Sequence, residues 1–416
     1  MGKSDNAHRR ARLTLNYRVR CEHSTIDLVC ILVGIQTRGE EVVLAMPSIR
    51  LISVTKRFKD NVALDRASLN VRSGEYVCVL GPTGSGKTTL LRVIAGLTQP
   101  DSGQLLIDGK SVDKMGPEDR GTAYVPQQYA LFPHLTVLQN VAFSPLAKGY
   151  KKAEAFEIAR KVLQTVKLAH REYAFPSELS GGMQQRVTLA RGIASGARLL
   201  LLDEPLGALD ARLRMELRTE LRRIAKDLSL TAIHVTHDQK EAMSIADTIV
   251  VLKDGNIQQT GSPFHLYQDP ASIFVSSFVG GSNFLPGVVV GIEGTNSLVE
   301  LRDGIRIRVH QRSHRRGEPV ILSVRQELTI LRNHADEKEN AIPGEIRGTS
   351  FVGDVIEYDV ELDNRETVKC KVPSYYVSER SLPFQTGERV FVTINPHDCN
   401  LYSEPPLGLA KELEAF

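Results

Sequence analysis

Residues 81–88 have the types and the spacing needed to hold the phosphates of a nucleoside triphosphate. They read Gly-Pro-Thr-Gly-Ser-Gly-Lys-Thr and match G-x-x-x-x-G-K-T at every specified position. Glycines allow successive backbone N–H groups to surround phosphate oxygens, next to the positive end of the following helix. Lys87 supplies a compact positive charge, and the hydroxyl of Thr88 is a ligand for Mg²⁺. The residues that we expect to contact the phosphates are Gly81, Pro82, Thr83, Gly84, Ser85, Gly86, Lys87, Thr88 and Thr89.

A second candidate site lies at residues 199–204, where four leucines are followed by Asp203 and Glu204. A buried strand has no structural use for two adjacent carboxylates unless its end opens on a polar site. We expect Asp203 to hold Mg²⁺ through a water molecule, and Glu204 to take the proton of an attacking water or to orient it. The alternative is an acidic strand end that faces solvent.

The elements that must position these residues alternate along the chain. Apolar strands are expected at residues 49–54, 75–80, 122–125, 199–202, 232–235 and 248–252, and helices at residues 88–95, 153–166 and 211–228. Continuous apolar strands that alternate with helices predict a parallel sheet covered on both faces. Residues 133–178 are mostly helical and lie between two motifs that must both reach the nucleotide, so we expect them to form a helical subdomain.

The pattern changes near residue 283 to short strands and turns. Two similar blocks follow one another, and each has a Pro-Gly pair near its start and a late apolar strand, at residues 320–324 and 390–394. This repetition predicts a duplicated small β-barrel over residues 283–405. The charged segment 334–340 is expected to be a solvated loop between the two copies.

Composition limits the function classes. A chain of 416 residues is expected to hold two or three domains, and its net charge of +3 gives no reason to expect nucleic acid as a partner. No stretch approaches the roughly 20 apolar residues that span a bilayer, so we expect any membrane role to come through a partner. The five cysteines form no CxxC pair, which is typical of a reducing compartment and argues against a disulfide framework or a zinc site.

The first 45 residues differ from the rest of the chain. A basic stretch precedes a short apolar run at residues 28–35 that lacks a small-residue cleavage site, so a signal peptide is not favoured. We expect either that Met46 is the true start or that residues 1–45 form a poorly ordered extension.

Residues 179–186 read Leu-Ser-Gly-Gly-Met-Gln-Gln-Arg and resemble the signature sequence of the ABC-type ATPases. The resemblance covers residues 48–280. It implies an α/β phosphate-loop NTPase domain with an ABC helical subdomain, followed by a β-rich domain of OB-like barrels of the TOBE type. It also implies that ATP and Mg²⁺ are bound and that ATP is hydrolysed.

The resemblance assigns further roles to single residues. Phe58 resembles the aromatic residue that stacks on adenine, with a core phenylalanine as the alternative. Gln127 resembles the glutamine that reaches Mg²⁺ and the attacking water, and the adjacent Gln128 leaves the register open. His237 resembles the histidine that contacts the γ-phosphate, whereas His234 lies within an apolar run and is expected to be packed.

Another set of residues is implied to act across a dimer. Ser180, Gly181 and Gly182 precede a helix and offer a hydroxyl, N–H donors and a helix N-terminus. In ATPases of this kind they complete the site of a second copy, so that two ATP molecules lie between the subunits, and Asp210 resembles the aspartate that links the two sites. Met183 stands where the family often has glutamine, which leaves the backbone contacts unaffected.

The aromatic segment 129–135 and the C-terminal barrels resemble those of ATPases that drive binding-protein-dependent importers. This implies integral-membrane permease subunits as partners, an extracytoplasmic substrate-binding protein as an indirect partner, and a location at the cytoplasmic face of the cell membrane. Residues 278–287 look most similar to those of the polyamine and iron groups, and less to the sulfate or sugar groups. One alternative is a soluble non-transport ABC ATPase, although the single phosphate loop and the lack of sustained heptads disfavour it. Another is a regulatory role in which the barrels bind a ligand.

Overall fold

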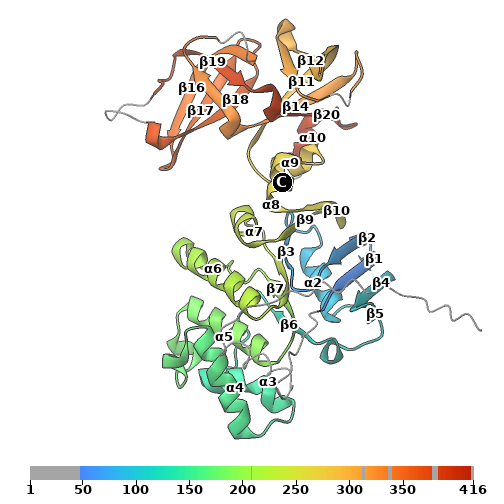
Figure 1. Cartoon of the computed structure of the whole chain (residues 1–416), viewed down its shortest axis with the longest axis vertical. Coiled ribbons are helices and arrows are strands. Elements are labelled where there is room, and N and C mark those ends of the chain that lie inside the picture. The colour runs from blue at the N-terminus through green and yellow to red at the C-terminus, as the bar shows by residue number, and fades with distance from the viewer. Residues whose placement is uncertain (1–46, 208, 312–313, 336–339, 377–382, 414–416) are drawn as a thin grey trace, which may run out of the picture.

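The computed structural model describes residues 47–207, 209–311, 314–335, 340–376 and 383–413. Figure 1 shows an elongated molecule, with an α/β part over residues 47–278 and two β-sheets at the opposite end. Residues 1–45, for which an alternative start or a poorly ordered extension was predicted, lie outside the described residues. Among the helices that are described, none is long and apolar enough to cross a membrane.

A six-stranded sheet with the order β10-β9-β3-β8-β7-β6 is the centre of the α/β part. Its strands are parallel except for β10, which pairs antiparallel with β9. Three of them, β3, β7 and β8, are buried along their whole length, which is why their sequences are mostly apolar. The strands are β3 Tyr76–Leu80, β6 Thr122–Val125, β7 Leu199–Asp203, β8 Thr231–Val235, β9 Thr248–Lys253 and β10 Asn256–Gly261.

Alternate residues of this sheet belong to two different cores, as the two-residue period of a strand requires. Leu199 and Leu201 face α2 (Lys87–Ala95) and a four-stranded antiparallel sheet of order β2-β1-β4-β5. Leu200 and Leu202 face the helical side of the molecule. The strands of the antiparallel sheet are β1 Ile49–Phe58, β2 Asn61–Val71, β4 Ser102–Ile107 and β5 Lys110–Ser111.

The helical side contains α3 Val137–Ala147, α4 Lys152–Thr165, α5 Gly181–Ala194, α6 Ala211–Asp227 and α7 Gln239–Ile245. A capping box between Thr136 and Gln139 begins α3. The side chain of Asn140, fully buried in α3, bonds to both backbone groups of Phe132 and to the carbonyls of Leu135 and Thr136. One satisfied amide therefore fixes the loop that precedes the helix.

The C-terminal region follows two short helices, α8 Pro263–Gln268 and α9 Ile273–Phe278. It consists of two five-stranded antiparallel sheets of order β13-β12-β11-β14-β20 and β15-β19-β16-β17-β18. A last helix, α10 Leu409–Leu413, returns to α9 (Figure 1). The strands are β11 Ser282–Glu293, β12 Asn296–Leu301, β13 Arg306–Val309, β14 Pro319–Arg325, β15 Thr329–Arg332, β16 Asn340–Phe351, β17 Val355–Leu362, β18 Thr367–Pro373, β19 Arg389–Ile394 and β20 Cys399–Ser403.

The duplication predicted for this region is present, but its two copies exchange strands. β11 to β14 repeat the pairing of β16 to β19, whereas β15 pairs with β19 of the second sheet and β20 pairs with β14 of the first. Buried residues of both sheets form one continuous core. The sequence blocks are therefore not two separate barrels, because the alternation of apolar residues does not specify which sheet the last strand joins.

Candidate active site

The predicted site residues that follow parallel strands come together, because those strands end at the same edge of the sheet. The register places Val79 of β3 beside Val235 of β8, and Val235 beside Asp203 of β7. The glycine-rich loop follows β3, His237 follows β8, Asp203 and Glu204 end β7, and Gln127 follows β6. Ligands of open α/β sheets bind at the carboxyl ends of strands, so this edge is the expected position of a site.

Two glycines of the loop 81–86 occupy positions that no other residue fits. A Cβ atom at Gly81 would lie 2.2 Å from the carbonyl oxygen of Leu252, and one at Gly86 would lie 2.2 Å from that of Ala63. Gly86 also has a φ of 103° and begins α2 with no side-chain cap. The first N–H groups of α2 are therefore left for a ligand, as at other anion-binding helix termini.

Lys87 and Ser85 fit a bound phosphate chain. The Lys87 Nζ donates to the carbonyl oxygens of Gly81 and Pro82, at 2.9 and 2.7 Å, so it lies across the loop. Burial lowers the pKa of Lys87, and the nearby carboxylates of Glu204 and Asp203 oppose that shift. The Ser85 Oγ is buried without a hydrogen-bond partner in the described part of the chain, which leaves a donor for an oxyanion.

Asp203 is buried and both of its carboxylate oxygens accept a hydrogen bond. Thr88 Oγ1 donates to Oδ1 at 3.0 Å, and the Tyr124 hydroxyl donates to Oδ2 at 2.7 Å. Burial raises the pKa of Tyr124 to about 12, and the bond to Asp203 adds to that shift. Among the described residues, no group of three His, Cys, Asp or Glu side chains could hold a metal ion. The oxygens of Thr88, Asp203 and Gln127 are nevertheless of the kind that Mg²⁺ prefers, since it binds few protein ligands together with phosphate.

Glu204 lies beside both of the other polar groups predicted for hydrolysis. Its Oε2 accepts from Gln127 Nε2 at 2.9 Å and lies 3.4 Å from His237 Nδ1. Both Gln127 and Gln128 are exposed, and the contact with the carboxylate is made by Gln127. The backbone of Glu204 has a φ of 46°. Residues other than glycine rarely adopt this conformation, and where they do it is often at a functional site.

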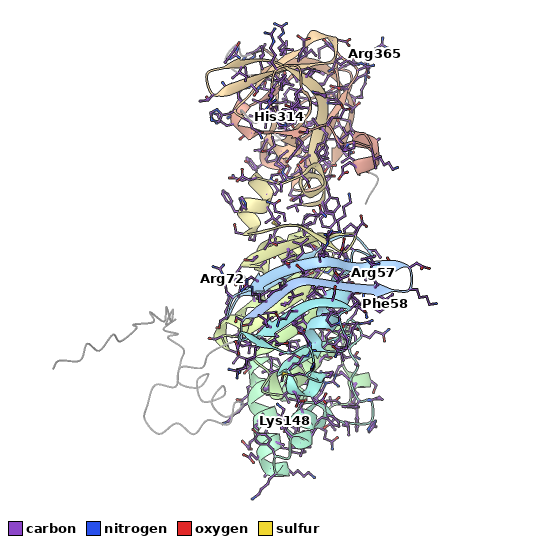
Figure 2. All side chains as sticks on the ribbon, turned by 90° about the vertical axis from the view of Figure 1, so that its right-hand side faces the viewer. Arg57, Phe58, Arg72, Lys148, His314 and Arg365 are labelled. Carbon is purple, nitrogen blue, oxygen red and sulfur yellow. The ribbon has the colours of Figure 1, made fainter. Side chains whose placement is uncertain are left out.

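Phe58 lies away from this cluster, at the tip of the β1–β2 hairpin (Figure 2). Its side chain is 49% exposed, and the Lys56 Nζ lies 5.4 Å from its ring centroid. The alternative of a core phenylalanine is therefore wrong. Stacking of Phe58 on adenine remains a prediction. An exposed, flat ring is suited to such stacking.

Ser180, Gly181, Gly182 and Asp210 also lie apart from the strand ends. The Ser180 Oγ accepts from Met183 N–H at 3.4 Å at the start of α5, and Asp210 Oδ1 accepts from Leu213 N–H at 2.9 Å at the start of α6. The two helix starts touch, because a Cβ at Gly182 would lie 2.3 Å from a methyl group of Leu213. The structure places these residues on the helical side of the sheet, whereas α2 lies on the other side.

His234 is fully buried, which confirms the prediction that it is packed. Its Nδ1 bonds to the Tyr76 hydroxyl at 2.9 Å, and its Nε2 lies 3.2 Å from Glu241 Oε1. Sequence reasoning missed Glu241 and also Tyr124. The available signal for Tyr124 was a polar aromatic residue three positions before Gln127 on an expected strand, and only the sheet order places that strand beside the one that ends in Asp203.

Together, the loop, its helix and the carboxylates define a phosphate-loop ATPase. A family model described as ABC transporter matches residues 64–207, and one described as TOBE domain matches residues 322–401. The chain is 42% identical to the Fe(3+) ions import ATP-binding protein FbpC of Brucella abortus (strain 2308), over 82% of this chain and 94% of that protein. It is 39% identical to the spermidine/putrescine import ATP-binding protein PotA of Pseudomonas aeruginosa (strain UCBPP-PA14), over 83% and 95%.

Among solved structures, cbiO1 of Clostridium perfringens, part of the ABC transporter complex cbiONQ, is 27% identical. It matches with a TM-score of 0.50 over 52% of this chain and 89% of its own. The chain thus belongs to the ABC transporter family, as an ATPase subunit that carries a C-terminal TOBE domain.

Proposed function

We propose that this chain is the ATP-hydrolysing subunit of an ABC importer, bound to permease subunits at the cytoplasmic face of the membrane. The observation that carries the proposal is the cluster of Lys87, Thr88, Asp203, Glu204 and Gln127 at one edge of the parallel sheet. The names of the relatives favour ferric iron or a polyamine as the transported substrate. The resemblance of residues 278–287 to the same two groups agrees with that choice.

The phosphates of ATP would be held by residues 81–89. Backbone N–H groups of the loop and of the first turn of α2 would bond to the phosphate oxygens, and Lys87 would turn from its two carbonyls to the β- and γ-phosphates. Thr88, Asp203 and Gln127 would hold Mg²⁺, which would neutralise charge on the phosphate oxygens. Phe58 would stack on the adenine ring.

Hydrolysis would use the carboxylate of Glu204 as general base. It would take a proton from the water that attacks the γ-phosphorus, as the bond to the oxygen of ADP breaks. Gln127 and His237 both contact Glu204 Oε2, and so hold the carboxylate in place. His237 is 62% exposed, which leaves its ring accessible to a γ-phosphate.

A homodimer would complete each site. Ser180, Gly181 and Gly182 offer donors at the N-terminus of α5, on the other side of the sheet from the α2 of their own subunit. They would close on the ATP bound by a second copy, next to Asp210 at the start of α6. Because Met183 packs against the helical core, the backbone and Ser180 would supply these contacts.

Segment 129–135 would form part of the surface for the permease. The Phe132 ring packs on Phe143, with centroids 4.5 Å apart, and the Arg191 guanidinium lies 5.4 Å from the Phe132 ring. Phe143 and Leu146 are 44% and 39% exposed, so an apolar patch is present beside this segment. An apolar patch with an adjacent cation is suited to an amphipathic helix of a partner.

Uptake measurements test this proposal. A strain that lacks this chain should lose ATP-dependent uptake of radiolabelled ferric iron or of spermidine and putrescine. The wild-type chain should restore uptake and Lys87→Ala should not. Unchanged uptake of all three substrates would refute the substrate assignment, and hydrolysis of ATP without any transport defect would favour a non-transport ATPase.

A further inference from the structure

The hydrogen bond between Tyr124 and Asp203 points to a residue that acts on the Mg²⁺ site without touching the nucleotide. Asp203 is 6% exposed, so its carboxylate has little contact with solvent. Both oxygens accept from hydroxyl groups, one from Thr88 at 3.0 Å and the other from Tyr124 at 2.7 Å. A buried carboxylate needs such donors, because leaving it without partners is strongly unfavourable.

The two donors are not equivalent. The proposed function assigns the Thr88 hydroxyl to Mg²⁺, so the position of that hydroxyl would be set by the cation as well as by Asp203. The proposed function gives Tyr124 no bond to the cation, and its hydroxyl oxygen also meets the guanidinium of Arg92, which leaves the phenol proton for Asp203. Its hydroxyl is therefore the donor that stays with Asp203 whether or not the nucleotide site is filled.

The backbone and the ring of Tyr124 are both fixed. β6 pairs in parallel with β7, with Tyr124 beside Leu201 and Val125 beside Leu202, so the residue lies one strand away from Asp203. The ring packs against the core that contains α2 and the antiparallel sheet. A donor held by packing fixes a carboxylate more firmly than a mobile surface side chain would.

We propose that Tyr124 is a positioning residue for Mg²⁺: its hydroxyl holds the Asp203 carboxylate so that the free lone pairs of Asp203 face the cation beside Thr88. The proposal rests on the proposed function, because it requires that Asp203 and Thr88 serve Mg²⁺. Loss of outer-shell partners of this kind weakens metal affinity about 10- to 100-fold in other proteins.

Tyr124→Phe removes only the hydroxyl and tests the proposal by binding rather than by turnover. Fluorescent ATP (a methylanthraniloyl derivative) is titrated with the full chain, once in EDTA and once in excess Mg²⁺. The ratio of the dissociation constant in EDTA to that in Mg²⁺ is the Mg²⁺ factor. We expect this factor to be about 10-fold or more smaller in Tyr124→Phe than in wild type. Affinity in EDTA should stay within about twofold of wild type.

Tyr76→Phe is the matched control, since it removes a buried phenol hydroxyl from the same sheet that bonds to His234 at 2.9 Å and not to Asp203. It should leave the Mg²⁺ factor unchanged. An unchanged factor in Tyr124→Phe, or an equal loss in both variants, would overturn the role of Tyr124. If wild type shows no tightening by Mg²⁺, the metal site of the proposed function fails as well. Thermal unfolding would show whether Tyr124→Phe folds poorly. In that case Tyr124→His, which can still donate to Asp203, should recover most of the Mg²⁺ factor. No recovery would count against the proposal.

Discussion

Replacing Glu204 by glutamine should separate ATP binding from ATP hydrolysis. The two side chains have the same shape, and a glutamine oxygen can still accept from Gln127 Nε2, which now lies 2.9 Å from Glu204 Oε2. The strained backbone at φ 46° is unaffected by this change. What disappears is the ability to take a proton from the attacking water. The variant should therefore keep its fold and its affinity for ATP.

The expected loss follows from the role of a general base. Such a group contributes about 10²- to 10⁴-fold to the rate, which corresponds to about 3–5 kcal/mol of the activation barrier. Glu204 is 22% exposed and has two polar neighbours in place, so it is positioned before the reaction begins. We expect kcat to fall within this range, with an ATP dissociation constant within about threefold of wild type.

Phosphate release at saturating MgATP measures kcat, and fluorescent ATP measures binding. Size-exclusion chromatography with ATP should also show a stable dimer, since in the proposed homodimer the nucleotide between the subunits would no longer be consumed. Glu216→Gln, a 60% exposed carboxylate on α6 paired with Arg212, is the control and should match wild type. A kcat within about fivefold of wild type would remove Glu204 from the base role.

Three further results are expected. Lys87→Ala should weaken ATP binding about 10- to 100-fold, because a charged hydrogen bond contributes about 1.5–3 kcal/mol, and unchanged affinity in a titration would contradict the phosphate assignment. Gly86→Ala should lower the thermal midpoint more than Gly84→Ala: both residues have positive φ, but only at Gly86 would the new Cβ lie 2.2 Å from a backbone oxygen, so equal midpoints would contradict the steric reasoning. The pKa of Asp247 is affected by burial, which raises it, and by the hydrogen bond from Lys226, which lowers it; the result is a pKa below the ordinary 3.8. Wild type should thus be more stable than Asp247→Asn above about pH 4 and lose that advantage as the pH falls through the lowered pKa, which thermal unfolding at several pH values would show.

Much of the α/β part could be predicted from local sequence. The expected strand 122–125 coincides with β6, and the expected helix 211–228 is α6, Ala211–Asp227, because continuous apolar runs and helical spacing reflect burial directly. The expected strand 49–54 is shorter than β1, which continues to Phe58 through a polar, half-exposed end. The end of β1 is a strand because its backbone pairs with β2, and the burial of its side chains is not the cause.

The C-terminal region shows where local sequence is insufficient. Its duplication was visible, but the exchange of β15 and β20 between the sheets was not, because either pairing buries the same faces of both strands. Only the path of the short connections after β14 and β19 selects the partner sheet.

The active site divides in the same way. By itself the sequence determined which chemistry is present, since a phosphate loop needs glycines and a lysine at fixed spacing, and a carboxylate pair at the end of an apolar strand needs a polar site. Tertiary structure decided which groups meet. The parallel register brings Gln127 and His237 to Glu204, and Tyr124 to Asp203, across strands that are distant in the chain. These contacts depend on the order of strands in the sheet, and no local spacing encodes that order.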